Sequence, residues 1–332
     1  MTPLFGHDAA VAAFRESLDS GRLHHAWLVS GPEGVGKGLF ALKAATLVLA
    51  AGAGPPLASQ GLDVPDEHPA ARLVEAGSHP DLMRLERLPK DNGASELARS
   101  ITVDQVRGLQ RLFGTTASMS AWRAVVIDAA DDLERNAANA LLKNLEEPPS
   151  SSVFLLVSHS PQRLLPTLRS RCRQLRLSLL GDDAMTSALR AALPDASAAE
   201  LAGLAEAGQG SPGRAIAFRG LDVDALDRTM HDLAASGDAT NARRSALAAA
   251  LCLKSAQPRY EAFLARAPSF IAAAARERRG APLAKALRLY ERAADLASGA
   301  TRLSLEPQSV VFELAGMIAA LAQPSVGVTG RR

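Results

Sequence analysis

The stretch Gly31-Pro-Glu-Gly-Val-Gly-Lys-Gly38 decides the fold. Gly31, Gly36 and Lys37 have the P-loop spacing G-x-x-x-x-G-K, in which glycines let backbone N–H groups surround a phosphate and the lysine reaches its terminal oxygens. The apolar run His25–Ser30 comes directly before it and predicts a buried strand, and the stretch after it, with few polar residues, predicts a helix. We therefore predict a nucleotide-binding α/β domain with this loop between strand and helix.

The loop lacks residues that hydrolysis needs. A Ser or Thr that binds Mg²⁺ normally follows the lysine, and this chain has Gly38 there. The apolar run Arg123–Asp128 has the form of a Walker B strand; in hydrolysing AAA+ proteins a Glu follows the Asp, but here Ala129 does. A positioned general base contributes about 10²–10⁴ to a rate, so we expect no useful hydrolysis. Asp131 or Asp132 is a less favoured substitute base.

The candidate residues of this degenerate nucleotide site are Gly31, Pro32, Glu33, Gly34, Val35, Gly36, Lys37, Gly38 and Asp128. The glycines and the lysine persist, so weak binding of ATP or ADP without catalytic Mg²⁺ stays open. No cofactor is expected to be required.

Further along the chain, strand patterns alternate with helical ones. Helices are predicted over 8–20, from Thr102 with Gln105 at capping-box spacing, and up to Glu147, and a second buried strand over 153–158. Continuous apolar runs are typical of parallel strands covered on both faces, so this order predicts a doubly wound parallel sheet. The Gly/Pro/Asp-rich stretch 52–80 is predicted to be a loop or insertion. After about residue 180 only helical patterns remain.

Composition excludes several classes of protein. Hydrophobic residues make up 47% and charged residues 22% of the 332-residue chain, as in globular proteins, and a length of this size predicts several domains. The net charge of +2 gives no general attraction to nucleic acid or membranes. Cys172 and Cys252 give no disulfide framework and no metal-ligand spacing, and Cys252 is expected in a helix core. Without a signal-peptide pattern or a long apolar span, the protein is expected to be cytoplasmic.

Ser170-Arg171-Cys172 ends the helix that follows the predicted strand 153–158. An arginine held there could stabilise charge on a phosphate bound by another subunit, and such a finger contributes about 10³–10⁵ to a rate. The alternative is a solvated arginine, because Arg169, Arg173 and Arg176 lie nearby. On these residues alone, the solvated surface role is the more common one.

Five segments together carry a family resemblance. They are His24-His-Ala-Trp-Leu-Val-Ser-Gly-Pro-Glu-Gly-Val-Gly-Lys37, His79-Pro-Asp81, Ile101-Thr-Val-Asp-Gln-Val-Arg107, Asn136-Ala-Ala-Asn-Ala-Leu-Leu-Lys-Asn-Leu-Glu-Glu-Pro-Pro149 and Leu168-Arg-Ser-Arg-Cys172. In this order they closely resemble the delta-prime family of bacterial DNA polymerase III clamp-loader subunits. The run that ends in Leu-Glu-Glu-Pro-Pro is a specific signature of such subunits. The resemblance is detailed over 1–180 and only architectural beyond.

The resemblance implies a AAA+ module over 1–180, a small helical lid over 181–221 and a helical collar over 222–322. The sequence after the collar, 323–332, is itself predicted to be a disordered tail. The resemblance also implies a non-hydrolysing subunit that joins delta and gamma/tau subunits in a hetero-oligomeric ring and helps to load the sliding clamp on primed DNA. Such a subunit is part of the polymerase III holoenzyme, a nucleotidyltransferase, and is cytoplasmic and nucleoid-associated through the replisome, with no membrane contact. Arg171, between Ser170 and Cys172, is then implied to reach the ATP of a neighbouring gamma/tau subunit.

Other matches to the family are partial. Ser158 matches the sensor position at the end of its strand. Arg214 resembles the arginine of a sensor-2 helix but lies one position later than usual, so a surface or capping role is favoured. Many relatives carry a four-cysteine zinc module before the His-Pro-Asp segment; this chain has no cysteine there, and His68 and His79 are too few ligands for zinc. We therefore expect no metal site.

Two other functions are weighed against this one. The intact Lys37 and Asp128 are compatible with an ATP-hydrolysing AAA+ clamp-loader or remodeller subunit, which Gly38 and Ala129 oppose. A P-loop kinase of small molecules explains neither the signature over 136–149 nor the long helical C-terminal half.

Overall fold

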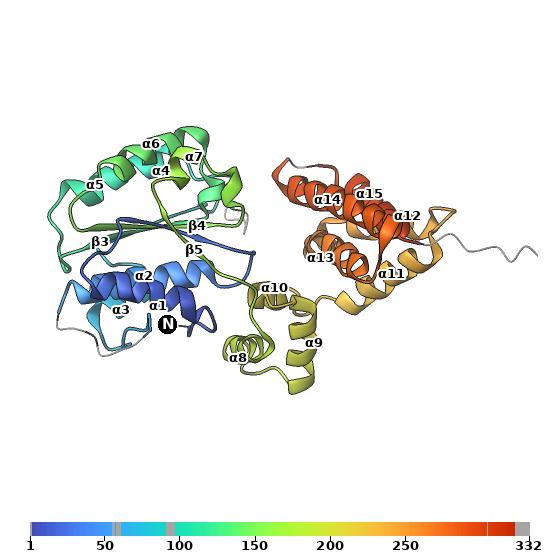
Figure 1. The fold of residues 1–332 in the computed structure, drawn as a ribbon, viewed down its shortest axis with the longest axis horizontal. Coiled ribbons are helices and arrows are strands. Elements are labelled where there is room, and N and C mark those ends of the chain that lie inside the picture. Colours follow the sequence, from blue (N-terminus) through green and yellow to red (C-terminus); the bar gives the residue numbers. More distant parts are fainter. Residues whose placement is uncertain (1, 55–56, 58–60, 91–96, 304, 323–332) are drawn as a thin grey trace, which may run out of the picture. The chain divides into compact units, whose positions relative to one another are not determined.

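The computed structural model describes residues 2–54, 57, 61–90, 97–303 and 305–322. The predicted disordered tail, 323–332, lies outside the described residues. The chain forms two compact units, Met1–Ile216 and Ala217–Arg332 (Figure 1), which we describe separately. In the ranges that the structure describes, no helix is long and apolar enough to cross a membrane.

The first unit is built on a five-stranded sheet with the order β2-β3-β4-β1-β5. The strands are β1 (Ala26–Ser30), β2 (Leu82–Glu86), β3 (Arg123–Asp128), β4 (Ser152–Ser158) and β5 (Arg173–Arg176). All neighbouring strands are parallel, which confirms the predicted sheet. The sequence patterns miss β2 and β5, because these two edge strands carry charged residues and form no continuous apolar run.

Helices cover both faces of the sheet (Figure 1). On one face lie α1 (Asp8–Asp19), α2 (Lys37–Ala51) and α3 (Pro69–Glu75), and on the other α4 (Val103–Arg107), α5 (Leu109–Gly114), α6 (Arg135–Glu146) and α7 (Pro166–Arg169). Alternate residues of β1 feed the two cores: Trp27 packs with Phe14 and Phe40, and Leu28 packs on the other side with Leu141. This two-sided burial fixes β1, and therefore the loop that follows it.

Two local predictions have different outcomes. The capping box at Thr102 and Gln105 is confirmed, with each side chain bonded to the other residue's backbone N–H. The prediction of an irregular stretch over 52–80 is wrong in part, because α3 lies within it. Pro69 starts that helix and the His68 side chain accepts a hydrogen bond from the N–H of Ala70, so the proline begins a helix here and does not break one.

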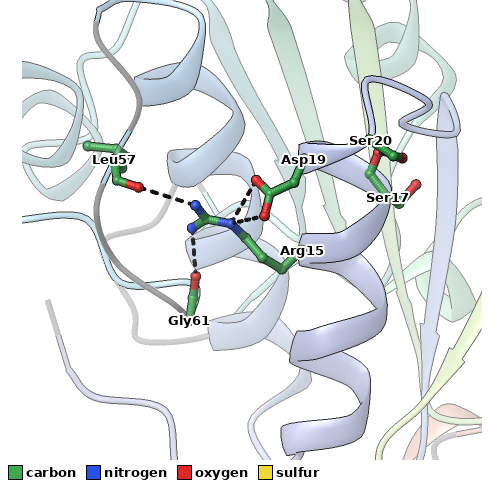
Figure 2. A network of polar contacts seen from close by, with 6 residues as sticks. All are labelled: Arg15, Ser17, Asp19, Ser20, Leu57 and Gly61. Carbon is green, nitrogen blue, oxygen red and sulfur yellow. Dashed lines mark hydrogen bonds and ion pairs between the residues drawn. The ribbon is translucent and has the colours of Figure 1, made fainter.

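Arg15 ties the start of this stretch to α1 (Figure 2). Its Nε donates to both carboxylate oxygens of Asp19 at 2.9 Å, one turn later on the same helix. Its two terminal nitrogens donate to the carbonyls of Gly61, at 3.2 Å, and Leu57, at 3.3 Å. One guanidinium therefore anchors two backbone points of a segment that contains no cysteine.

The remainder of the chain is helical, as predicted. α8 (Asp182–Ala192), α9 (Ala198–Gly208) and α10 (Pro212–Ala217) are followed by α11 (Val223–Ser236), α12 (Ala242–Leu251), α13 (Gln257–Arg276), α14 (Gly280–Arg302) and α15 (Pro307–Ala319). Domain boundaries at 180 and 221 stay predictions. The expected core position of Cys252 is wrong: it is the C-cap of α12, partly exposed, and Leu247 and Leu251 supply the buried side chains there.

Candidate functional site

The P-loop joins the carboxyl end of β1 to α2, as predicted from its sequence. Gly31, Gly34 and Gly36 have φ angles of +148°, +75° and +98°, which L-residues with side chains rarely adopt. Gly31 also has no room for a side chain, since a Cβ there would lie 2.1 Å from the carbonyl oxygen of Leu177. The glycines therefore serve both the backbone curl and the close approach of the chain that follows β5.

Lys37 is turned onto its own loop. Its side chain is buried, and Nζ donates to the carbonyl of Gly31 at 2.8 Å and to that of Pro32. Burial lowers the pKa of Lys37 to about 8, although Glu33 and Asp128 favour the charged form. The lysine that would reach a phosphate thus has two backbone acceptors within the loop.

Asp128 occupies the space beside Gly38. A Cβ added at Gly38 would lie 2.2 Å from Oδ2 of Asp128. Burial raises the pKa of Asp128, an effect larger than the opposing ones of His159 and Lys37. The hydroxyl of a magnesium-binding Ser or Thr therefore has no room at position 38 with Asp128 in this conformation.

The start of α10 lies directly on the P-loop. The hydroxyl of Ser211 donates to the carbonyl of Glu33 at 2.8 Å, and the N–H of Gly213 donates to the carbonyl of Gly34 at 2.8 Å. A Cβ on Gly34 would lie 2.4 Å from Oγ of Ser211 and 2.8 Å from the backbone nitrogen of Arg214. The candidate sensor Arg214 is thus beside the loop through its backbone, which the Ser211 hydroxyl caps at 3.3 Å.

Ser158 forms a hydrogen bond with Asp131. Its hydroxyl donates to Oδ1 of Asp131 at 3.1 Å, and the same carboxylate accepts the N–H groups of His159, at 2.8 Å, and Ser160, at 3.0 Å. Three donors therefore hold Asp131 at the end of β4. Asp132 is engaged differently, in an ion pair of 3.1 Å with Arg87. The three hydrogen bonds favour a structural role for Asp131, whereas Asp132, whose pKa burial raises, stays compatible with the alternative of a substitute base.

A pocket of about 440 Å³ lies at the carboxyl ends of β2, β3 and β4. It is lined by Glu86, Arg87, Pro89, Leu97, Asp128, Ala129, Asp132 and His159. Among the described residues, no group of three or more His, Cys, Asp or Glu side chains is placed to hold a metal ion.

Arg171 lies at the opposite end of the strands, where β1 and β5 begin. It precedes β5, which runs parallel to β1 and pairs Arg173 with Trp27, whereas the P-loop follows the other end of β1. The five residues of β1 separate the two ends of the strands by about 15 Å. Arg171 is one-third exposed, and its terminal nitrogens donate to Oε1 of Glu146 at 2.6 Å and to the carbonyl of Thr167 at 2.8 Å.

The neighbours of Arg171 anchor its turn. The hydroxyl of Ser170 donates to the carbonyl of Thr167 at 3.1 Å, and the buried thiol of Cys172 donates to the carbonyl of Leu168 at 3.3 Å. Burial raises the pKa of Cys172 to about 12, so the thiol stays protonated and unreactive. Ser170 and Cys172 bond to the backbone of the turn; Cys172 is buried, whereas Ser170 is exposed and Arg171 is partly exposed.

The sequence profile of the family described as "DNA polymerase III, delta subunit" matches residues 6–180 of the 332-residue chain. The chain belongs to this family. DNA polymerase III subunit delta' of Pseudomonas aeruginosa is 40% identical over 188 residues, which are 57% of this chain and 53% of that protein. DNA polymerase III subunit delta' of Escherichia coli K12 is 33% identical over 221 residues, 66% of this chain and 62% of that protein.

The chain thus spans about half to three fifths of the length of these delta' relatives. The crystal structure of a DNA polymerase III gamma subunit-related protein of Thermotoga maritima aligns with a TM-score of 0.43 and 14% identity, over 90% of this chain and 94% of that one.

In this member of the delta-subunit family, the predicted residues form two groups. The P-loop, Asp128 and the start of α10 lie together at the carboxyl ends of the strands, and the Ser158–Asp131 hydrogen bond lies at the same end. Arg171 lies apart from them, at the amino ends of the strands. The two groups belong to one polypeptide, but they cannot act on the same phosphate within it.

Three residues with a clear place in the two groups were missed by sequence reasoning: Asp131 as the partner of Ser158, Ser211 as the contact to the loop, and Glu146 as the partner of Arg171. The signal for Glu146 was present, because it is part of the family signature before Pro148. The sequence gives no signal for the other two, whose partners are far away in the chain.

Proposed function

We propose that this chain is a delta-prime-type subunit of a DNA polymerase III clamp loader, one that hydrolyses no ATP and supplies Arg171 in trans to ATP held by a neighbouring gamma/tau subunit. The observation that carries the proposal is the position of Arg171: partly exposed, anchored, and a full strand length away from the chain's own P-loop. An arginine placed there is out of reach of the chain's own P-loop, so a phosphate that it binds would be held by another chain.

The chain's own nucleotide site supports a non-hydrolysing role. Gly38 offers no hydroxyl for Mg²⁺, Ala129 replaces the glutamate, and Lys37 bonds to the loop carbonyls. We propose that this P-loop serves as a packing site for the start of α10, and that it binds ATP or ADP weakly at most, without catalytic Mg²⁺. No zinc or other cofactor is required in this proposal.

The proposed partners are the delta and gamma/tau subunits in a hetero-oligomeric ring, and through them the sliding clamp and primed DNA. The subunit would then be a cytoplasmic, nucleoid-associated part of the polymerase III holoenzyme. The similarity to delta' proteins over the matched half supports this assignment.

Reconstitution tests the proposal. The chain is mixed with cognate delta and gamma/tau subunits, and complex mass and DNA- and clamp-stimulated ATPase are measured. We expect a defined hetero-oligomer whose ATPase needs this chain and falls about 10³-fold or more with Arg171→Ala, while Arg169→Ala, the control two residues earlier, keeps it. No assembly, together with turnover by this chain alone that Lys37→Ala removes, would make it a self-sufficient ATPase instead.

A further inference from the structure

We infer that Glu146 is the positioning residue for Arg171, an inference that rests on the proposed role of Arg171 in trans. Glu146 ends α6, and its Oε1 accepts a hydrogen bond of 2.6 Å from the Arg171 guanidinium across 25 residues of chain. The pair lies at the surface, with side-chain exposures of 48% for Glu146 and 33% for Arg171. An exposed pair of this kind contributes little to stability. Its role in this inference is to set the orientation of the Arg171 side chain.

Glu146 stands on a fixed support. The residue before it, Leu145, is buried, and its carbonyl accepts a hydrogen bond of 3.1 Å from Nε2 of His25, just before β1. After Glu147 the chain enters Pro148 and Pro149, which cannot continue a helix. The prolines therefore stop α6, and the burial and hydrogen bond of Leu145 hold the backbone that carries Glu146 relative to the sheet.

Arg171 is held from its other side. The carbonyl of Thr167, in α7, accepts a hydrogen bond of 2.8 Å from Nη1, while Glu146 takes Nη2. The buried Cys172 fixes the next residue of the turn. The guanidinium is thus clamped between a carbonyl of α7 and a carboxylate of α6, and few of its rotamers satisfy both contacts.

The clamp leaves donors for a ligand. A guanidinium carries five N–H donors in one plane, and these two contacts use one on each terminal nitrogen. Three N–H groups remain, including one on each terminal nitrogen, enough for bidentate binding of a phosphate. Glu146 can therefore hold Arg171 while the arginine binds a phosphate, and no release of the ion pair is needed.

Preorganisation of this kind acts on the rate more than on substrate binding, because an arginine finger stabilises charge that develops in the transition state. Misplacing a catalytic group by about 1 Å costs up to about 10²-fold in rate. We expect Glu146→Ala to lower the kcat of the assembled loader about tenfold and to leave the KM for ATP within about twofold. Glu146→Gln keeps an oxygen acceptor at the same reach and should restore part of the loss.

The test uses the complete reconstituted complex with Glu146→Ala, Glu146→Gln, Arg171→Ala and, as the matched control, Glu147→Ala. Glu147 is the adjacent exposed carboxylate at the end of α6. Complex mass and the melting temperature of each variant chain verify assembly and folding. The expected result is a graded kcat, lowest for Arg171→Ala, then Glu146→Ala, then Glu146→Gln, with Glu147→Ala equal to the original chain.

Two other results separate the possible failures. If Arg171→Ala lowers kcat and both Glu146 variants match or exceed the original chain, Glu146 does not position the arginine and this inference is wrong, while the proposed function stands. If Arg171→Ala leaves kcat unchanged in a complete complex, the role of Arg171 in trans is wrong, and the inference falls with it.

Discussion

Oδ2 of Asp128 lies 2.2 Å from the position that a Cβ on Gly38 would take. The missing hydroxyl at position 38 is therefore coupled in space to Asp128, the residue just before Ala129, which stands where hydrolysing AAA+ proteins have a glutamate. The Asp128 carboxylate, which would bind a metal, lies in the volume that a side chain at position 38 would need.

This contact predicts the effect of restoring the hydroxyl. We expect Gly38→Ser to lower the free energy of unfolding by about 1–2 kcal/mol, because the half-buried Asp128 side chain must turn away from position 38. In an Asp128→Ala background the same substitution should cost much less, a coupling that urea unfolding of the four chains measures. Gly203→Ser is the control, since a Cβ on Gly203 in α9 meets nothing within 4 Å. Equal costs of Gly38→Ser in both backgrounds would contradict the contact.

Lys37 predicts a stability that depends on pH. Burial lowers its pKa from 10.5 to about 8, so the folded chain releases this proton before the unfolded chain does. Stability therefore rises as the pH increases from about 8 to 10.5, since the unfolded state binds more protons in that window. At pH 7 the lysine is charged in both states and its buried charge is a cost.

We therefore expect Lys37→Met to raise the free energy of unfolding at pH 7 by about 1 kcal/mol, after allowing for the two loop carbonyls that lose a donor. The gain should shrink between pH 8 and 10.5. Urea unfolding at several pH values measures it, and the exposed Lys285→Met controls for the loss of one positive charge. A lower stability of Lys37→Met at pH 7 would mean that the two carbonyl bonds outweigh the burial of the charge.

The parts of the fold that could be predicted are those marked by a local sequence pattern, such as a continuous apolar run or a short motif. β1, β3 and β4 are continuous apolar runs because they lie inside the sheet with helices on both faces, and the P-loop motif placed α2. β2 and β5 contain arginine, glutamate or glutamine because an edge strand needs less apolar surface, so no periodic pattern marks them. α3 was hidden in a stretch of turn-forming residues, where Pro69 starts a helix.

The site was predicted as a set of residues but not as a set of contacts. The signature over 136–149 included Glu146, yet its partner Arg171 is 25 residues later and meets it only because α6 and α7 cover the same face. Ser211 meets the carbonyl of Glu33 across 178 residues. Such pairs depend on how elements pack, which no local pattern carries.

Arg15 makes a prediction about the segment that begins after α2. Replacing it by alanine removes the donors to Leu57 and Gly61, so we expect faster hydrogen exchange at Leu62 and a loss of about 1 kcal/mol in unfolding free energy. Arg15→Lys should restore little, because an ammonium on a flexible stem cannot hold Asp19 and two carbonyls in one plane. The matched control is Arg22→Ala, a nearby arginine after α1. Unchanged exchange at Leu62 in Arg15→Ala would show that the core contacts of Leu62 suffice.

Substitution of Asp131 distinguishes a structural role of this carboxylate from a role in hydrolysis. It accepts three hydrogen bonds, from the Ser158 hydroxyl and from the N–H groups of His159 and Ser160. Bonds to a charged acceptor are about twice as strong as neutral ones, so we expect Asp131→Ala to cost about 2 kcal/mol in unfolding free energy. Asp132→Ala, which loses one partly exposed ion pair with Arg87, should cost at most about 1 kcal/mol.

The same two variants, measured as assembled loaders, test hydrolysis by this chain. A carboxylate that orients an attacking water contributes to turnover even when the fold is intact. For a structural Asp131, the ATPase of the complex should follow only the fraction of folded chain, and conditions that keep Asp131→Ala folded should restore it. A complex that contains fully folded Asp131→Ala but has lost the turnover that Lys37→Ala also removes would assign Asp131 to catalysis. The three hydrogen bonds that fix its carboxylate favour the structural role.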